Sequence, residues 1–183
     1  MATLVLTVIG DDRAGLVDAL AGPIADHGGN WDRSHMARLA GKFAGIVVVT
    51  LPDEHVDSLS ASLAGVQAQG LLDVRIAIAA ADGPIDSSSL LQLRLVGQDR
   101  PGIIREVARA LAQRNVSIEE LETSTVSAPM SAEQLFQATA TLRLPLDLGL
   151  DALQAALEDI ANELMVDLEV KTPPNGITAP ERG

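Results

Sequence analysis

The sequence predicts an α+β fold made of two tandem copies of one β-α-β-β-α-β unit, each a four-stranded antiparallel sheet with two helices on one face. Two observations predict it: a repeated glycine-containing segment, and the same order of strand and helix periodicities in each copy. The first segment, residues 8–16, is VIGDDRAGL, and the second, residues 95–103, is LVGQDRPGI, 87 residues later. Self-similarity at a fixed offset indicates a duplicated structural unit.

Each copy opens with a strand followed by a helix. Residues 3–9 and 90–96 are β-branched or leucine-rich runs of strand length that end at Gly10 and Gly97. After the turn, apolar residues at helical spacing predict one buried helix face in each copy: Leu16, Leu20 and Ile24, and then Ile104, Ala108 and Leu111. Pro23 lies inside the first of these helices and deletes a backbone donor, so we expect a kink there.

A β-hairpin, a second helix and a last strand complete each copy. The hairpin strands are predicted at residues 31–39 with 45–51 and at 116–126 with 134–144, and the closing strands at 71–79 and 165–170. Apolar spacings of three and four mark the second helices: Val56, Leu59, Leu63 and Val66, and then Leu153, Leu157, Ile160 and Leu164. The second copy has gained six residues, which we place in a hairpin loop at 127–133. Along residues 136–144, apolar residues alternate with Gln and Thr, which predicts one solvated sheet face.

Proline, glycine and serine delimit the two copies. Residues 82–89 predict a linker between a first domain at 1–81 and a second at 90–171. Residues 172–183 contain three prolines and two glycines and predict a disordered tail. The order of elements within each domain is that of the ferredoxin-like arrangement.

Composition argues against several classes of function. A formal net charge of −12 opposes direct nucleic-acid binding, which needs clustered Lys and Arg. The chain has no cysteine, and His27, His35 and His55 lack the spacing of metal ligands, so we expect no metal and no cofactor. No motif of a nucleophile elbow or a phosphate-binding loop is present, so we do not expect an enzyme. The N-terminus resembles a strand rather than a signal peptide, and no apolar stretch is long enough to cross a membrane, which predicts a cytoplasmic protein without membrane contact.

Candidate ligand-binding residues cluster at the start of the first helix of each copy. The unpaired backbone N–H groups and the positive dipole end of a helix attract a carboxylate, and glycine lets a ligand approach the backbone. The turn before the second strand offers further polar groups. In the first copy the candidates are Gly10, Asp11, Asp12, Arg13, Ala14, Gly15, Leu16, Gly29, Asn30 and Trp31. In the second copy they are Gly97, Gln98, Asp99, Arg100, Pro101, Gly102, Ile103, Asn115 and Ser117.

These candidates also have structural interpretations. The glycines suit a tight turn and helix packing as well as a ligand site. Asp12 and Asp99 could hold a ligand ammonium, but we favour them as helix caps. Arg13 and Arg100 could bind a carboxylate, although exposed arginines at a helix start more often pair with neighbouring acids.

The turn before the second strand differs between the copies. Asn30 offers a donor and an acceptor suited to an α-amino acid, but asparagine also stabilises ordinary turns. Trp31 is expected beside the same pocket, or else in the core or at an interface. The second copy has Asn115 and Ser117 where the first has Gly28 and Asn30, so the two sites need not bind the same ligand.

These residues carry a family resemblance over almost the whole chain. The order strand, Gly-x-Asp-Arg-x-Gly, helix, and a turn with Gly or Asn resembles the ACT domain, a regulatory amino-acid-binding module. Two such domains, the first with the sequence GDDRAGLV, resemble the glycine cleavage system transcriptional repressor-like proteins.

The resemblance implies a non-enzymatic regulator. It would bind a small amino acid, glycine or a relative, and would contact a protein partner such as a DNA-binding regulator. Association into a homodimer is also implied. Two alternatives stay open: a structural or assembly module with vestigial sites, and, less favoured, a small enzyme.

Overall fold

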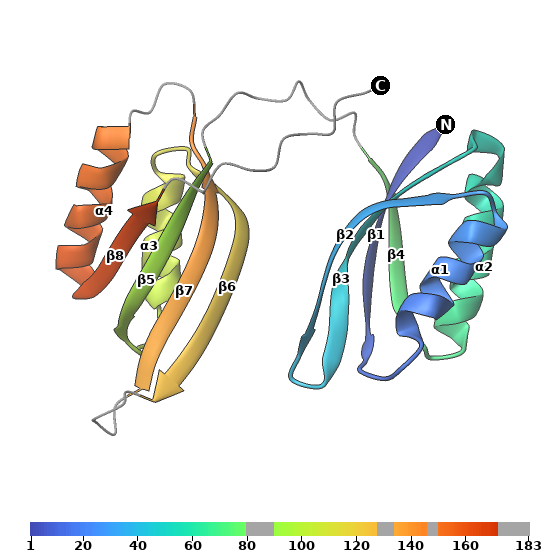
Figure 1. The fold of residues 1–183 in the computed structure, drawn as a ribbon, viewed down its shortest axis with the longest axis horizontal. Helices are drawn as coiled ribbons and strands as arrows, with labels where there is room; N and C mark the ends of the chain where they lie inside the picture. Colours follow the sequence, from blue (N-terminus) through green and yellow to red (C-terminus); the bar gives the residue numbers. More distant parts are fainter. Residues whose placement is uncertain (80–89, 128–133, 146–149, 172–183) are drawn as a thin grey trace. The chain divides into compact units, whose positions relative to one another are not determined.

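The chain forms two compact units, Met1–Pro84 and Ile85–Gly183, seen in the computed structural model (Figure 1). The structure describes residues 1–79, 90–127, 134–145 and 150–171. The predicted linker at 82–89, the predicted tail at 172–183 and most of the predicted hairpin loop lie outside the described residues.

The first unit follows the predicted order of elements. Its elements are β1 (Ala2–Asp11), α1 (Leu16–Asp26), β2 (Asn30–Leu39), β3 (Lys42–Leu51), a short 3-10 turn (Asp53–His55), α2 (Val56–Ala68) and β4 (Asp73–Ile78). The strands form one antiparallel sheet in the order β2-β3-β1-β4, and both helices cover the same face of it (Figure 1).

The second unit repeats this architecture. Its elements are β5 (Leu90–Gln98), α3 (Ile103–Ala112), β6 (Ser117–Ser127), β7 (Gln134–Arg143), α4 (Leu150–Leu164) and β8 (Val166–Lys171). The sheet order is β6-β7-β5-β8, again antiparallel throughout. The predicted fold class, two tandem ferredoxin-like units, is therefore confirmed.

Each unit has a core of its own, built from alternate strand residues and one face of each helix. In the first unit the predicted stripe of α1, Leu16, Leu20 and Ile24, is buried against the sheet. In α3 the predicted stripe is right at Leu111 and wrong by one position at Ile104 and Ala108. The buried residues there are Ile103, Val107 and Leu111, whereas Ile104 and Ala108 are only partly buried. The repeat offset predicts the buried residues of α3 correctly, because these three residues lie 87 positions after the α1 stripe.

The first helix of each unit begins later than predicted. Gly10 and Gly97 do not end their strands but lie inside β1 and β5. A Cβ atom on Gly10 would lie 2.5 Å from the carbonyl oxygen of Leu71, and one on Gly97 would lie 2.5 Å from Cγ1 of Val166. Both glycines therefore permit close packing between the ends of neighbouring segments.

Helix α1 continues through Pro23 to Asp26. Gly22 precedes the proline, and because it has no Cβ it avoids the clash that a proline ring makes with a preceding helical residue. Gly22 thus removes one of the steric costs of a proline inside a helix. The kink expected at this position stays a prediction.

Candidate functional site

The turn between β1 and α1 borders an open hollow of about 340 Å³ in the first unit. The lining residues are Asp12, Arg13, Gly15, Leu16, Val17, Asp18 and Phe43. The first four were candidates from the sequence, so the structure brings part of the predicted site together. A free amino acid is small enough for a hollow of this volume.

A glycine in the left-handed backbone region starts each first helix. Gly15 has φ = 92° and Gly102 has φ = 94°, and both occupy the N-cap position without a side-chain hydrogen bond to the helix. The prediction that Asp12 and Asp99 cap these helices is therefore wrong, because the chain makes a further turn before the helix begins. The first residues of α1, Leu16, Val17 and Asp18, line the hollow, and no side chain caps this end of the helix. An uncapped helix start is an arrangement that attracts an anion.

Adding a side chain at these N-cap glycines would not cause a steric clash. A Cβ on Gly15 or Gly102 would meet nothing within 4 Å. What requires glycine here is the positive φ angle, which L-residues with a side chain adopt only at a cost. The expected approach of a ligand to Gly15 and Gly102 stays a prediction, and the close contacts within the units are those of Gly10 with the carbonyl oxygen of Leu71 and of Gly97 with the side chain of Val166.

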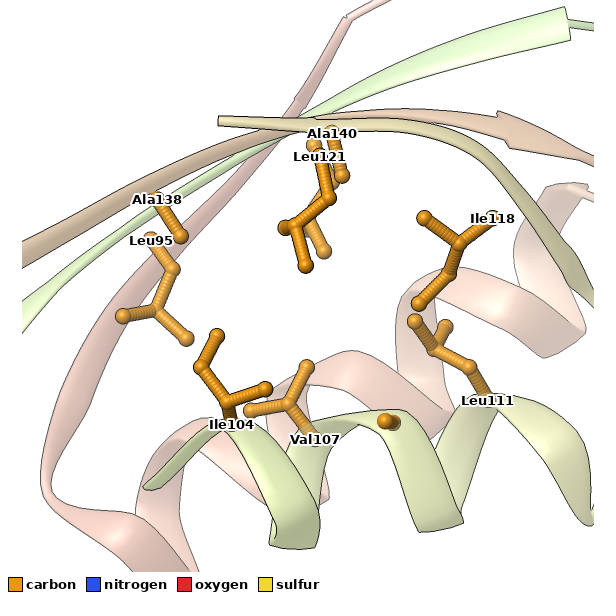
Figure 2. Close-up of a pocket in the computed structure, with 10 residues that line it drawn as sticks. Leu95, Ile104, Val107, Leu111, Ile118, Leu121, Ala138 and Ala140 are labelled. Carbon is orange, nitrogen blue, oxygen red and sulfur yellow. The ribbon is translucent and has the colours of Figure 1, made fainter. Parts of the chain in front are cut away.

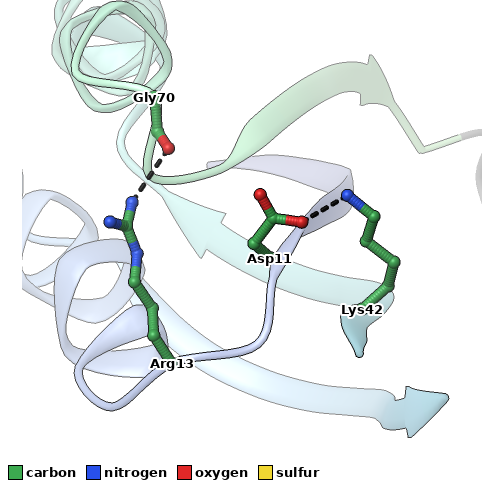
Figure 3. A network of polar contacts seen from close by, with 4 residues as sticks. All are labelled: Asp11, Arg13, Lys42 and Gly70. Carbon is green, nitrogen blue, oxygen red and sulfur yellow. Dashed lines mark hydrogen bonds and ion pairs between the residues drawn. The ribbon is translucent and has the colours of Figure 1, made fainter. Parts of the chain in front are cut away.

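The charged residues of this turn are held by partners within the first unit (Figure 3). Lys42 donates a hydrogen bond to the carboxylate of Asp11, and this bond with its charge holds the pKa of Asp11 below its usual value. Arg38 forms an ion pair with Asp12. Arg13 donates through Nη2 to the carbonyl oxygen of Gly70, 2.8 Å away, and so ties the turn to the residues that follow α2. These contacts orient the turn. The group that the guanidinium of Arg13 binds, the carbonyl of Gly70, is neutral.

The matching turn of the second unit is organised differently. Arg100 binds the carboxylate of Glu106 through two hydrogen bonds, of 3.3 Å and 2.6 Å. The bond from Arg100 lowers the pKa of Glu106. The first unit has Ala19 at the position of Glu106, so it cannot make this pair. The expectation that such an arginine pairs with a neighbouring acid is confirmed for Arg100, whereas Arg13 binds a carbonyl.

Three further candidates of the first unit, Gly29, Asn30 and Trp31, lie at the far end of its sheet. Asn30 pairs with Thr50 on β3, whereas Gly10 pairs with Phe43 near the opposite end of the same strand. Seven residues of strand separate these positions, about 23 Å at 3.3 Å per residue. Asn30 and its neighbours Gly29 and Trp31 therefore do not join the hollow within this unit. Of the two places expected for Trp31, beside the pocket or in the core or an interface, the structure shows packing against the core of the first unit.

The second unit shows the same separation. Ser117 pairs with Arg143 at one end of the sheet, whereas Gly97 pairs with Phe136 near the other. Asn115 lies just before β6, with a left-handed φ of 55°. Its role as a turn residue follows from that conformation.

Sequence reasoning missed three lining residues: Val17, Asp18 and Phe43. The first two directly follow the repeated segment and could have been found by extending it along the helix. Phe43 comes from β3 and reaches the site because it pairs with Gly10. Only the register between β1 and β3 brings it there.

The ACT-domain family matches residues 2–77 and again residues 91–158. The chain belongs to the ACT-domain family. This ACT-domain protein is similar in structure to an uncharacterised protein from Galdieria sulphuraria, with 28% identity, a TM-score of 0.80, and coverage of 93% of this chain and 97% of that one. It also shares its fold with a proposed glycine cleavage system transcriptional repressor, with 18% identity, a TM-score of 0.70, and coverage of 93% and 96%. Curated proteins gave no match to the sequence.

Two further observations concern the described part of the ACT-domain protein. None of its helices there is long and apolar enough to span a membrane. No cluster of three or more His, Cys, Asp or Glu side chains that could hold a metal ion occurs among the described residues.

Proposed function

We propose that this ACT-domain protein is a non-enzymatic cytoplasmic regulator that binds a small amino acid, glycine or a close relative, at the β1–α1 turn of the first unit. The observation that carries the proposal is the hollow at the uncapped start of α1. Membership of the ACT-domain family supports it, since the sequence resembles a regulatory amino-acid-binding module.

The hollow offers complementary groups for both ends of an amino acid. A carboxylate would accept hydrogen bonds from the N–H groups of the first turn of α1, where the helix dipole also favours negative charge. The ammonium would lie near the carboxylate of Asp18, which is in the same turn. Val17 and Phe43 provide apolar walls. Such a site prefers a ligand with a small side chain.

Binding would be communicated by contact with another protein, for example a DNA-binding regulator, rather than by direct contact with nucleic acid. The net charge of −12 supports this choice, because phosphate groups would be repelled. Association into a homodimer belongs to the same proposal.

The Arg100–Glu106 pair favours a different role for the second unit. There the guanidinium of Arg100 is already bound to Glu106, so an external carboxylate would have to compete with an internal one. This favours the view that the second unit is a structural module with a vestigial site. One amino acid per chain is then the expected stoichiometry.

A thermal shift screen of the twenty standard amino acids, followed by calorimetry, tests the proposal. We expect glycine or another small amino acid to raise the melting temperature of the full chain. Asp18→Asn should weaken binding about tenfold or more, because a hydrogen bond to a charged group contributes about 1.5–3 kcal/mol. The matched control is Asp57→Asn, which removes an acid from the first turn of α2, outside the hollow. Absence of stabilisation by all twenty amino acids at millimolar concentration would contradict the proposal.

A further inference from the structure

The hollow at the start of α1 is lined by more negative than positive charge. Three charged side chains border it: the acids Asp12 and Asp18, and the base Arg13. Asp18 suits the ammonium of an amino acid, but the carboxylate of Asp12 would repel the carboxylate of the same ligand. Binding of a zwitterion at this place therefore requires that the charge of Asp12 be balanced.

The β2–β3 hairpin supplies a base that balances Asp12. Arg38, near the end of β2, forms an ion pair through its Nε atom with the carboxylate of Asp12. The backbone N–H of Asp12 also donates to the carbonyl oxygen of Gly41 in the hairpin turn, 2.9 Å away. The side chain of Arg38 is 70% exposed and does not line the hollow, whereas that of Asp12 is 31% exposed and does. Arg38 therefore influences a ligand through Asp12 and not by contact with the ligand.

A second ion pair joins the same turn to the same hairpin (Figure 3). Lys42, the first residue of β3, pairs with Asp11, the last residue of β1. The side chain of Asp11 is 80% exposed and does not line the hollow. Of these two ion pairs, it is the pair of Asp12 that borders the place proposed for the ligand. The Lys42 pair is therefore an internal control for a purely structural role.

The second unit keeps the acid of this arrangement without the base. Asp99 lies 87 residues after its counterpart in the first unit. Arg38 pairs with Phe43 on β3. The matching position in the second unit is Thr125, which pairs with Phe136. A threonine carries no charge, so it cannot neutralise Asp99.

The cavity of the second unit in Figure 2 has a different character. It lies between α3 and the sheet, has a volume of about 20 Å³, and its described lining consists of Leu, Ile, Val and Ala. A cavity of this volume holds one water-sized group and offers no charge to a zwitterion. The balancing base thus occurs in the unit whose turn borders a hollow of about 340 Å³.

We propose that Arg38 is a positioning residue of the amino-acid site in the first unit. By neutralising Asp12, it leaves the hollow with one base, Arg13, and one acid, Asp18, which match the two charges of a zwitterion. The site then favours small amino acids with a free carboxylate and an uncharged side chain over amines that lack the carboxylate. This inference rests on the proposed function and names the ligand class of the same site.

Isothermal titration calorimetry on the full chain tests the inference by comparing an amino acid with its amide. The probes are glycine with glycinamide and alanine with alaninamide, at about pH 6 so that the α-amino groups are protonated. Arg38→Gln should lower the ratio of amino-acid to amide affinity about threefold to tenfold in about 0.1 M salt, as expected for one unpaired charge beside a partly exposed site. Arg38→Lys keeps the charge and should keep the ratio within about twofold of the wild type. Circular dichroism checks folding, which should persist because an exposed ion pair contributes little to stability.

Further variants separate charge from structure. Lys42→Gln breaks the other ion pair and should change the ratio by less than about twofold, because Asp11 lies outside the hollow. Asp12→Asn combined with Arg38→Gln removes both charges and should restore the wild-type ratio. In about 1 M salt the effect of Arg38→Gln should largely disappear, because the Debye length falls from about 10 Å to about 3 Å.

The outcomes distinguish this inference from the proposed function. Equal weakening of amino acid and amide by Arg38→Gln, or the same change in ratio from Lys42→Gln, would show a structural role and overturn the inference alone. Loss of both probes in Asp12→Asn would place the ammonium at Asp12 and would also overturn it. If the wild type binds neither glycine nor alanine, the proposed function and this inference fall together.

Discussion

Replacing Gly15 with alanine isolates the backbone conformation at the start of α1. The residue has φ = 92°, and an added Cβ would meet no atom within 4 Å, so a steric clash contributes nothing. The cost is the left-handed conformation itself, about 1–2 kcal/mol for a residue with a side chain. Gly15→Ala should therefore lower the free energy of unfolding of the first unit by about this amount.

Gly65→Ala is the matched control for this change. Gly65 lies inside α2, has no positive φ, and also has open space around its missing Cβ. The same substitution there should stabilise the first unit by about 1 kcal/mol, because alanine favours a helix over glycine by that amount. The same glycine-to-alanine substitution at two exposed positions is thus expected to change the free energy of unfolding in opposite directions.

Trp31 provides the assay. It is the single tryptophan of the chain and packs against the core of the first unit, so its fluorescence reports unfolding of that unit. With a urea m-value of about 1 kcal/mol per molar, Gly15→Ala should lower the midpoint by about 1–2 M and Gly65→Ala should raise it by about 1 M. Shifts of the same sign in both variants would refute the reasoning, since neither site differs in available space.

Two further predictions concern the cores and the surface charges. Leu20→Ala removes a fully buried side chain and should destabilise the first unit by about 2–5 kcal/mol, while the circular-dichroism transition of the second unit stays in place because the cores are separate. The hydrogen bond from Arg143 lowers the folded-state pKa of Glu119 from its ordinary value of 4.5, so the pair contributes stability above that pH and loses it as the pH falls through the lowered folded-state pKa. Wild type should therefore lose more stability than Glu119→Gln when urea midpoints of the second unit are compared from pH 6 down to pH 3. Equal losses would show that the ion pair does not contribute.

Two glycines of the repeated segment show that the sequence can predict where glycine is needed but not why. Gly10 and Gly15 look equivalent in the sequence, and both recur 87 residues later. In the structure, Gly10 is required by a neighbouring carbonyl oxygen and Gly15 by its own positive φ. The repeat predicted that glycine matters at both places. The reason differs because it depends on the segment that packs beside each one.

In the candidate site too, some features follow from local sequence and others from the pairing of distant strands. Leu16 and its neighbours could be predicted to start a helix next to a carboxylate-attracting turn, since helix periodicity is local. The separation of Asn30 from that turn, and the arrival of Phe43 beside it, depend on which strands pair and in which register. Local patterns do not contain that register.

The sequence alone determined the duplication, the order of elements and the fold of each unit, because strand and helix periodicities are local and the repeat confirms each of them twice. Tertiary structure decided where α1 and α3 begin, which face of α3 is buried, which residues line the hollow, and that Arg13 binds a carbonyl oxygen whereas Arg100 binds Glu106. These properties depend on contacts between residues that are far apart in the chain. Two copies with one pattern therefore present two different surfaces.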